Sequence, residues 1–228
     1  MPEAGVSGRL VLLAGATSAS GLAAARVLTG EGARVIAVGR DEAKLAALAA
    51  EVPGTHTEAC DLTDDTEVAA LAARVHAGHG PVDGVLHLVG GWRGGGGLAG
   101  QTDADYRFLE RSFTALRHIS RVFDADLVSS GAGRLAVVSS TAVARPLAGG
   151  ANYAAVKAAT EAWTRAVAQG WAKAARDAGE PLRAASVIFR VKALEGLEDR
   201  LAHAFADLFV ADADEINDTI VELTPPSH

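Results

Sequence analysis

The sequence of 228 residues predicts an α/β fold built on a doubly wound parallel sheet. Short apolar runs of β-forming residues alternate with longer helical stretches, which is the pattern of buried parallel strands covered by helices. A glycine-containing turn joins the first apolar run to the first helix, as in nucleotide-binding α/β units. No Pro/Ser-rich linker or charge run interrupts the alternation, so we expect one domain over residues 1–228, with 1–8 and 224–228 as loose ends.

The strands are predicted where apolar and β-branched residues run together between Gly, Pro and Asp turn signals. They are expected at residues 9–14, 34–39, 55–60, 82–88, 135–139, 182–188 and 219–223. The helices are predicted from Ala-rich composition or from apolar residues at helical spacing. They are expected from the glycine turn to about residue 28 and at about 42–50, 64–76, 151–178 and 197–210, and the segment from 103 to about 130 is expected to contain a long helix.

Composition argues against several classes of protein. The formal net charge is −7 and the basic residues are scattered, which argues against a nucleic-acid partner. No stretch approaches the ~20 apolar residues of a membrane span, so we expect no membrane association. Cys60 is the only cysteine, which favours a reducing, cytoplasmic location. The seven histidines lack metal-ligand spacing, so we predict no metal site.

The turn from Gly15 to Gly21 can present backbone N–H groups and a helix N-terminus to a pyrophosphate. The alternative is a tight strand-to-helix turn without a ligand. The dinucleotide-binding candidates in this turn are Gly15, Thr17, Ser18, Ala19, Ser20, Gly21 and Leu22.

The end of the second strand predicts which dinucleotide is bound. Gly39 stands where NAD-selective folds use an acidic residue for the ribose hydroxyls, and Arg40 follows it. A neutral residue followed by Arg suits a 2′-phosphate, so we predict NADP (NADPH) as the cofactor rather than NAD. Asp41 can instead cap the next helix.

A proton-transfer site is predicted at the fifth strand and the helix after it. Tyr153 and Lys157 are four residues apart in an Ala-rich segment, so both side chains should rise from one helix face. An adjacent ammonium favours the phenolate, which makes Tyr153 a candidate general acid/base. Ser140 ends the strand, where its hydroxyl can hold a carbonyl oxygen. The alternative is a surface Tyr beside a solvated Lys.

The strand, Ser139-Ser140, the loop at 144–150, Tyr153-x-x-x-Lys157 and the upstream glycine turn together resemble the short-chain dehydrogenase/reductase family. The likeness runs from Arg9 to Leu223. It implies the strand order 3-2-1-4-5-6-7 and hydride transfer between a nicotinamide and a small carbonyl or alcohol substrate. It also implies that Tyr153 protonates the substrate oxygen, that Lys157 lowers the phenol pKa and holds the nicotinamide ribose, and that Ser140 orients the carbonyl.

Further positions follow from the resemblance. Asp61 and Leu62 are expected to flank the adenine, although Asp61 can also cap a turn or helix. The family's Asn-Asn-Ala-Gly after the fourth strand is replaced by Leu88-Val89-Gly90-Gly91, whose glycines still let the backbone approach the cofactor ribose. Cofactor contacts are therefore expected from Val89, Gly90 and Gly91.

The sequence departs from the family pattern at several positions. Ala19 stands at the middle glycine of the turn, and Ser112 stands at the place of a catalytic Asn, which puts in doubt the water relay to Lys157. The Pro-Gly that walls the nicotinamide is absent. In its place, Phe189 can back the nicotinamide, and Arg190 or Lys192 can meet a phosphate or an acidic substrate, unless these two lie on a solvated surface.

The segment Gly90-Gly91-Trp92, followed by glycines at 94–97, is similar to the dihydropteridine reductase branch of the family. Trp92 can stack on a flat substrate or anchor a loop. Two alternatives therefore stand beside carbonyl reduction: reduction of a conjugated C=N substrate, and a dinucleotide-binding protein without turnover.

The family resemblance further implies a homodimer or homotetramer. The two long helices, around residues 108–123 and 153–172, form the usual association face of the family. In this chain they supply apolar residues, including Trp163 and Val167, beyond what one sheet face needs.

Overall fold

A computed structural model describes residues 5–225, whose strands form one seven-stranded, all-parallel sheet in the order β3-β2-β1-β4-β5-β6-β7. This confirms the predicted doubly wound fold and strand order. The strands are β1 Leu10–Ala14, β2 Arg34–Gly39, β3 His56–Ala59, β4 Gly84–His87, β5 Arg134–Ser140, β6 Ala185–Val191 and β7 Ile220–Glu222. Of the predicted loose ends at 1–8 and 224–228, residues 1–4 and 226–228 lie outside the described residues.

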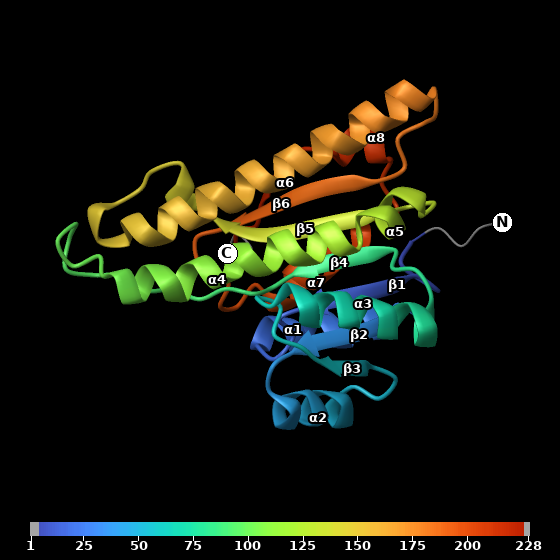
Figure 1. The fold of residues 1–228 in the computed structure, drawn as a ribbon, viewed down its shortest axis with the longest axis horizontal. Coiled ribbons are helices and arrows are strands. Elements are labelled where there is room, and N and C mark those ends of the chain that lie inside the picture. The colour runs from blue at the N-terminus through green and yellow to red at the C-terminus, as the bar shows by residue number, and fades with distance from the viewer. Residues whose placement is uncertain (1–4, 226–228) are drawn as a thin grey trace.

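Helices cover both faces of the sheet (Figure 1). They are α1 Ala19–Gly30, α2 Glu42–Glu51, α3 Asp65–His79, α4 Asp103–Val122, α5 Asp124–Ser129, α6 Ala151–Ala178, α7 Glu198–Asp207 and α8 Ala213–Ile216, with short 3₁₀ turns η1 Thr141–Val143 and η2 Ala148–Gly150. Within residues 5–225 no helix has the length and apolarity needed to cross a bilayer.

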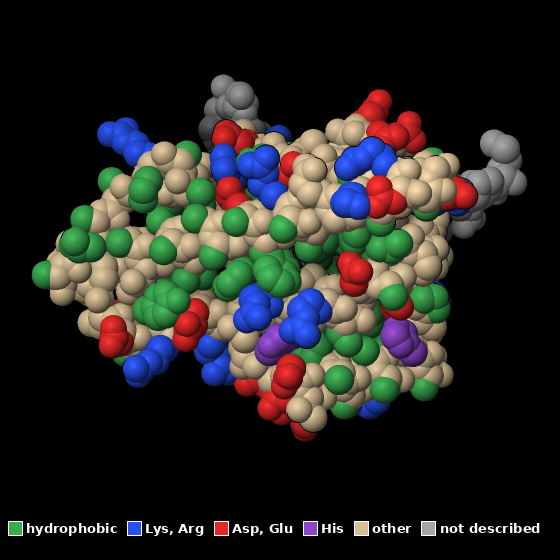
Figure 2. Space-filling view, turned by 45° about the horizontal axis from the view of Figure 1, so that its top comes forward, with side chains coloured by type: hydrophobic (Ala, Val, Ile, Leu, Met, Phe, Trp, Pro, Cys, Tyr) green, Lys and Arg blue, Asp and Glu red, His purple; other side chains and the backbone are tan. Residues whose placement is uncertain are grey.

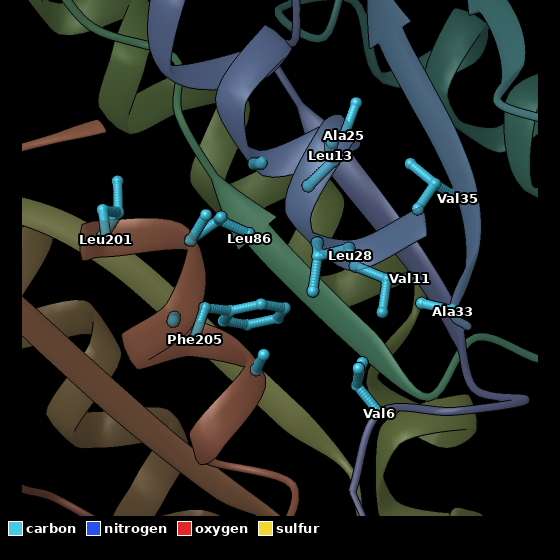
Figure 3. Close-up of a cluster of buried hydrophobic side chains, with 14 of the residues drawn as sticks. Val6, Val11, Leu13, Ala25, Leu28, Ala33, Val35, Leu86, Leu201 and Phe205 are labelled. Atoms are coloured by element: carbon cyan, nitrogen blue, oxygen red, sulfur yellow. The ribbon is translucent and has the colours of Figure 1, made fainter. Parts of the chain in front are cut away.

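Two hydrophobic cores lie on opposite faces of the sheet because neighbouring strand residues point in opposite directions. Side chains of α1, α2 and α7 form one core with Leu13 of β1, and Leu28 and Phe205 are fully buried there (Figure 3). Side chains of α3, α4 and α6 form the other core with Leu12 of β1. The strand ends that carry the predicted site are thus fixed from both sides.

The segment 103–130, which was predicted to contain a long helix, contains α4 and the short α5. Phe123 ends α4 with its ring fully buried, and Asp124 begins α5 while its carboxylate accepts a bond of 2.8 Å from Trp171 Nε1. The helix predicted at about 197–210 is α7, which ends at Asp207 rather than at residue 210. The short helix α8 was not predicted.

The sixth strand was predicted three residues too early. The ladder between β5 and β6 runs from Arg134↔Ala185 to Ser140↔Val191. Leu182 lies before this ladder. Arg190 consequently lies inside the strand, and its charge is balanced by a carboxylate described below.

Candidate active site

The glycine turn is a tight connection between β1 and α1. Gly15 has φ +91°, and a Cβ there would lie 2.8 Å from the Val89 backbone nitrogen. At Gly21 a Cβ would lie 1.9 Å from the Ala16 carbonyl oxygen. Ser18 caps α1, its Oγ accepting from the Gly21 N–H at 3.2 Å. Both predicted glycines are therefore required by close backbone approach, whereas Ala19, in the place of the middle glycine, fits as the first residue of α1.

A cavity of about 430 Å³ opens at the carboxyl ends of β1, β2 and β4, which is where α/β sheets bind their ligands. It is lined by ten of the predicted site residues: Gly15, Thr17, Ser18, Arg40, Asp61, Leu62, Val89, Gly90, Gly91 and Ser112. The cavity lining does not include the other four predicted turn residues: Ala19, Ser20, Gly21 and Leu22. Ser20 and Gly21 are buried in α1. The open, polar-edged cavity with a helix N-terminus beside it fits a dinucleotide.

Arg40, directly after the end of β2, brings a guanidinium to the lining of the cavity. Arg40 has a side chain that is 66% exposed, and its Nη1 lies 3.9 Å from Asp61 Oδ2. Asp41 caps α2 by accepting from the Lys44 N–H at 3.0 Å. Its carboxylate is thus occupied with the helix, and Arg40 is the charged side chain of this strand end that lines the cavity.

Asp61 is held by two sets of donors. The Thr63 backbone N–H and hydroxyl both donate to Oδ1, at 3.0 and 2.7 Å, and Arg111 Nη2 donates to Oδ2 at 2.8 Å. Partial burial alone would raise the pKa of Asp61, but the bonds from Thr63 and the charge of Arg111 outweigh burial and lower it. Asp61 is therefore an anchored carboxylate. Arg111, on α4, is a cavity residue that sequence inspection missed, because only the folded chain brings it to Asp61.

Ser140, Tyr153 and Lys157 come together at the carboxyl end of β5 and the start of α6. The Ser140 hydroxyl is close enough to Tyr153 to lower the pKa of its phenol, and Lys157 Nζ lies 5.8 Å from the centre of the Tyr153 ring. The Ser140 Oγ also accepts from the Ala142 N–H at 3.1 Å, which fixes its direction. Burial raises the pKa of Tyr153, and the nearby Ser140 hydroxyl opposes this rise. The phenol is therefore neutral at pH 7, in contrast to the expectation that Lys157 alone would lower its pKa.

Lys157 is almost fully buried, and its Nζ donates to the Val138 carbonyl at 2.7 Å. Burial lowers its pKa to about 8, against the opposing attraction of the Glu161 carboxylate. A Cβ at Gly90 would lie 3.8 Å from this Nζ, so the ammonium borders a residue that lines the cavity. Lys157 thus faces the region where a sugar bound along Gly90 and Gly91 would lie.

A buried network of charged and polar side chains lies one helical turn beyond Lys157. Glu161, one helical turn later, accepts two bonds from Arg190, at 2.8 and 2.6 Å, and one from the Ser139 hydroxyl at 2.7 Å. These bonds lower the pKa of Glu161 although burial would raise it. The network joins α6, β5 and β6. Arg190, predicted as a phosphate or substrate contact, is occupied by this carboxylate; the four-residue spacing from Lys157 to Glu161 was the one signal in the sequence.

His87 on β4 is a second buried group near Lys157. Its Nε2 donates to the Ser112 carbonyl at 3.0 Å, and its Nδ1 is buried without a hydrogen-bond partner among the described residues. Burial, together with the charge of Lys157, lowers the pKa of His87 to about 3, so the imidazole is neutral. The position of His87 next to Lys157 was not predicted from the sequence.

The remaining predicted contacts lie as follows. The Ser112 hydroxyl donates to the Leu109 carbonyl of its own helix at 2.7 Å. Phe189 is fully buried in the core of α1, α2 and α7, so its ring offers no exposed face to a nicotinamide. Trp92 is 61% exposed, and Lys192 is exposed beyond β6. The structure therefore does not bring Phe189, Arg190 or Lys192 to the cavity, and Trp92 does not line it either. Ser140, Tyr153 and Lys157 lie beside the cavity and are not part of its lining.

Gln101 fixes the glycine-rich loop that carries Trp92. Its amide nitrogen donates to the carbonyls of Gly95 and Gly97, at 3.1 and 3.2 Å, and to that of Gly149 at 3.0 Å. Its oxygen accepts from the Asn152 N–H at 3.2 Å. The loop is thereby tied to the start of α6, next to Tyr153, and this residue was also missed from the sequence.

The comparisons agree with this geometry. Residues 9–175 match the family model for short chain dehydrogenases. The chain is 33% identical over 167 residues to nodulation protein G of Rhizobium meliloti, covering 72% of this chain and 67% of that protein. It is 27% identical over 170 residues to the 2,3-dihydro-2,3-dihydroxybenzoate dehydrogenase of Bacillus subtilis, covering 72% of this chain and 65%, less than two thirds, of that enzyme.

A solved structure of a metagenomic short-chain oxidoreductase in complex with NADP superposes with a TM-score of 0.80 at 26% identity, covering 97% of this chain and 99% of that one. The fold, the family model and the sequence relatives all indicate the same family. This chain belongs to the short-chain dehydrogenase/reductase family.

Proposed function

We propose that this protein is an NADPH-dependent oxidoreductase that transfers hydride between the nicotinamide and a small carbonyl or alcohol substrate. The observation that carries the proposal is the convergence of Ser140, Tyr153 and Lys157 at the carboxyl edge of the sheet, with Lys157 next to Gly90 of the cavity lining. A buried ammonium and a half-buried phenol cost folding free energy, and chemistry is a reason to keep them together.

The cofactor, when bound, supplies the hydride. Tyr153, neutral because burial raises its pKa, donates the proton to the oxygen that becomes an alkoxide. Ser140 is fixed by the Ala142 N–H and holds its hydroxyl toward that same oxygen. Lys157, whose pKa of about 8 leaves it mainly charged at pH 7, holds the nicotinamide ribose and favours the phenolate left on Tyr153.

Arg40 is the basis for preferring NADPH over NADH. Its exposed guanidinium can bind the 2′-phosphate, and Gly39 before it supplies no carboxylate to repel that group. The metagenomic relative was solved with NADP, which supports this choice. Arg40→Asp should reverse the preference, as measured by titrating both cofactors and following nicotinamide fluorescence. Tighter binding of NADH by the unaltered protein would refute the preference.

A second candidate activity is reduction of a conjugated C=N bond, as in a quinonoid dihydropterin. It is favoured by the exposed Trp92 on a loop that Gln101 ties to Gly149 and the start of α6, because a flat ring system can stack there. Assays with activated ketones, diketones and a quinonoid dihydropterin distinguish the candidates. A Trp92→Ala variant should lose rate on the dihydropterin alone if stacking is the contact.

We also propose a homodimer or homotetramer that associates through α4 and α6. The two helices lie side by side, and Figure 2 shows hydrophobic side chains along the face on which they lie. Trp163 remains only partly buried although its ring packs against Phe113 with centroids 6.1 Å apart. Light scattering at micromolar concentration tests this, and a strictly monomeric mass would contradict it.

A further inference from the structure

Two guanidinium groups meet on one carboxylate oxygen at the cavity. Arg111 Nη2 donates to Asp61 Oδ2 at 2.8 Å, and Arg40 Nη1 lies 3.9 Å from the same oxygen. The two arginines come from distant elements, the end of β2 and the middle of α4, and both line the cavity. The Arg111 side chain is 43% exposed, so its other N–H donors remain open to a ligand.

Further hydrogen bonds fix the Asp61 carboxylate in its position next to the two arginines. Its Oδ1 is held by both donors of Thr63, and its backbone N–H donates to Glu67 Oε2 at 2.7 Å. Asp61 therefore stays beside both guanidiniums, and Glu67, which accepts from its backbone N–H, adds a second carboxylate next to this contact. Without Arg111 the cluster would carry a net negative charge and would repel an incoming phosphate.

We infer that Arg111 is a second determinant of the preference for NADPH, acting on the 2′-phosphate. It neutralises Asp61, which leaves the Arg40 guanidinium free to bind the phosphate, and it offers its own unused donors to the same group. The inference rests on the proposed preference for NADPH. It assigns a specificity role to a residue of α4, outside both the glycine turn and the end of β2.

A different role for Arg111 makes a different prediction. If its planar guanidinium only stacked on the adenine ring, NADPH and NADH would both lose affinity on its removal, because they share the adenine. A phosphate contact affects NADPH alone. The ratio of the two affinities therefore separates the roles, and no turnover is needed to measure it.

The test titrates the full chain with NADPH and with NADH, following nicotinamide fluorescence, and measures the binding of 2′,5′-ADP and AMP, which lack the nicotinamide, by titration calorimetry. The variants are Arg111→Ala and Arg111→Lys. Arg121→Ala is the matched control, since it removes the same charge from the exposed face of α4 and Arg121 does not line the cavity. Thermal melts confirm that each variant is folded.

Arg111→Ala should weaken NADPH and 2′,5′-ADP about tenfold, which is about 1.4 kcal/mol, and should change NADH and AMP less than about twofold. Arg111→Lys should fall between, because it keeps the charge and loses the planar fork. Equal weakening of both cofactors, or no change in either, would overturn the inference. If NADPH is preferred and only Arg40→Asp removes the preference, this inference fails and the proposed function stands; if the unaltered protein prefers NADH, both fail.

Discussion

Replacing Lys157 by Met should stabilise the fold in a manner that depends on pH. Lys157 is 8% exposed, and burial lowers its pKa from 10.5 in the unfolded chain to about 8 in the fold. Between these two values the unfolded state binds a proton that the folded state does not, so stability rises with pH. Below pH 8 both states are protonated, and the full cost of the buried ammonium is present.

The pKa difference gives the size of the effect. At about 1.36 kcal/mol for each pKa unit, the buried charge costs about 3 kcal/mol at pH 7. At pH 9.5 the same relation leaves about 1 kcal/mol, because most folded molecules then carry neutral Lys157. Met fills a similar volume and has no charge to desolvate. The stability difference between Lys157→Met and the unaltered protein should therefore shrink by about 2 kcal/mol from pH 7 to pH 9.5.

Urea denaturation at both pH values measures this difference. Lys173→Met is the control, because Lys173 lies on the same helix with a side chain that is 70% exposed. Its difference from the unaltered protein should change little over the same range. A Lys157→Met difference that is constant with pH would refute the claim that Lys157 is a desolvated ammonium. The variant should also lose cofactor affinity and turnover together, since Lys157 is proposed to hold the ribose and to tune Tyr153.

Three further changes test the supports of the site. Gly21→Ala should lower the free energy of unfolding by about 1–3 kcal/mol and weaken cofactor binding, because the added Cβ would lie 1.9 Å from a backbone carbonyl oxygen. Gly30→Ala in the same helix is the control, because its Cβ meets no neighbouring atom, and it should change neither stability nor binding. His87 is neutral in the fold with a pKa of about 3, so from pH 7 to pH 5 proton uptake by the unfolded chain should cost about 2 kcal/mol of stability, and His87→Leu should remove that loss. Glu161→Gln should cost about 3 kcal/mol in urea denaturation because it leaves Arg190 without its counter-charge, and pairing it with Arg190→Met should recover part of the loss; full stability of Glu161→Gln alone would contradict the charge network.

The sheet and its order could be predicted because strand and helix signals have short range. The apolar run before Gly15, the glycine spacing to Gly21 and the four-residue spacing of Tyr153 and Lys157 are local patterns with local physical causes. The family resemblance then supplied the strand order, which no local pattern contains. Boundaries failed where tertiary contacts decide them, as at Phe123, whose burial ends α4, and at Arg190, which lies inside a strand.

The charged residues around the site could not be predicted, because tertiary contacts bring them together. Arg111 is fifty positions from Asp61, and His87 is twenty-five from the Ser112 carbonyl that it contacts. Such pairs exist only once the strands are in order. Burial also changed an expected sign: the pKa of Tyr153 is raised in the fold, although a lysine nearby had suggested the opposite.

The most direct test of the account is the rate of Tyr153→Phe. The change removes one hydroxyl and keeps the ring, so the fold and cofactor affinity should remain. Turnover should fall by a factor on the order of 10² to 10⁴, because a positioned proton donor is lost. The measurement follows NADPH absorbance with the ketones, diketones and quinonoid dihydropterin, for the unaltered protein and the variant side by side. A substrate that both proteins reduce at the same rate, or no NADPH oxidation by the unaltered protein with any of them, would contradict the account.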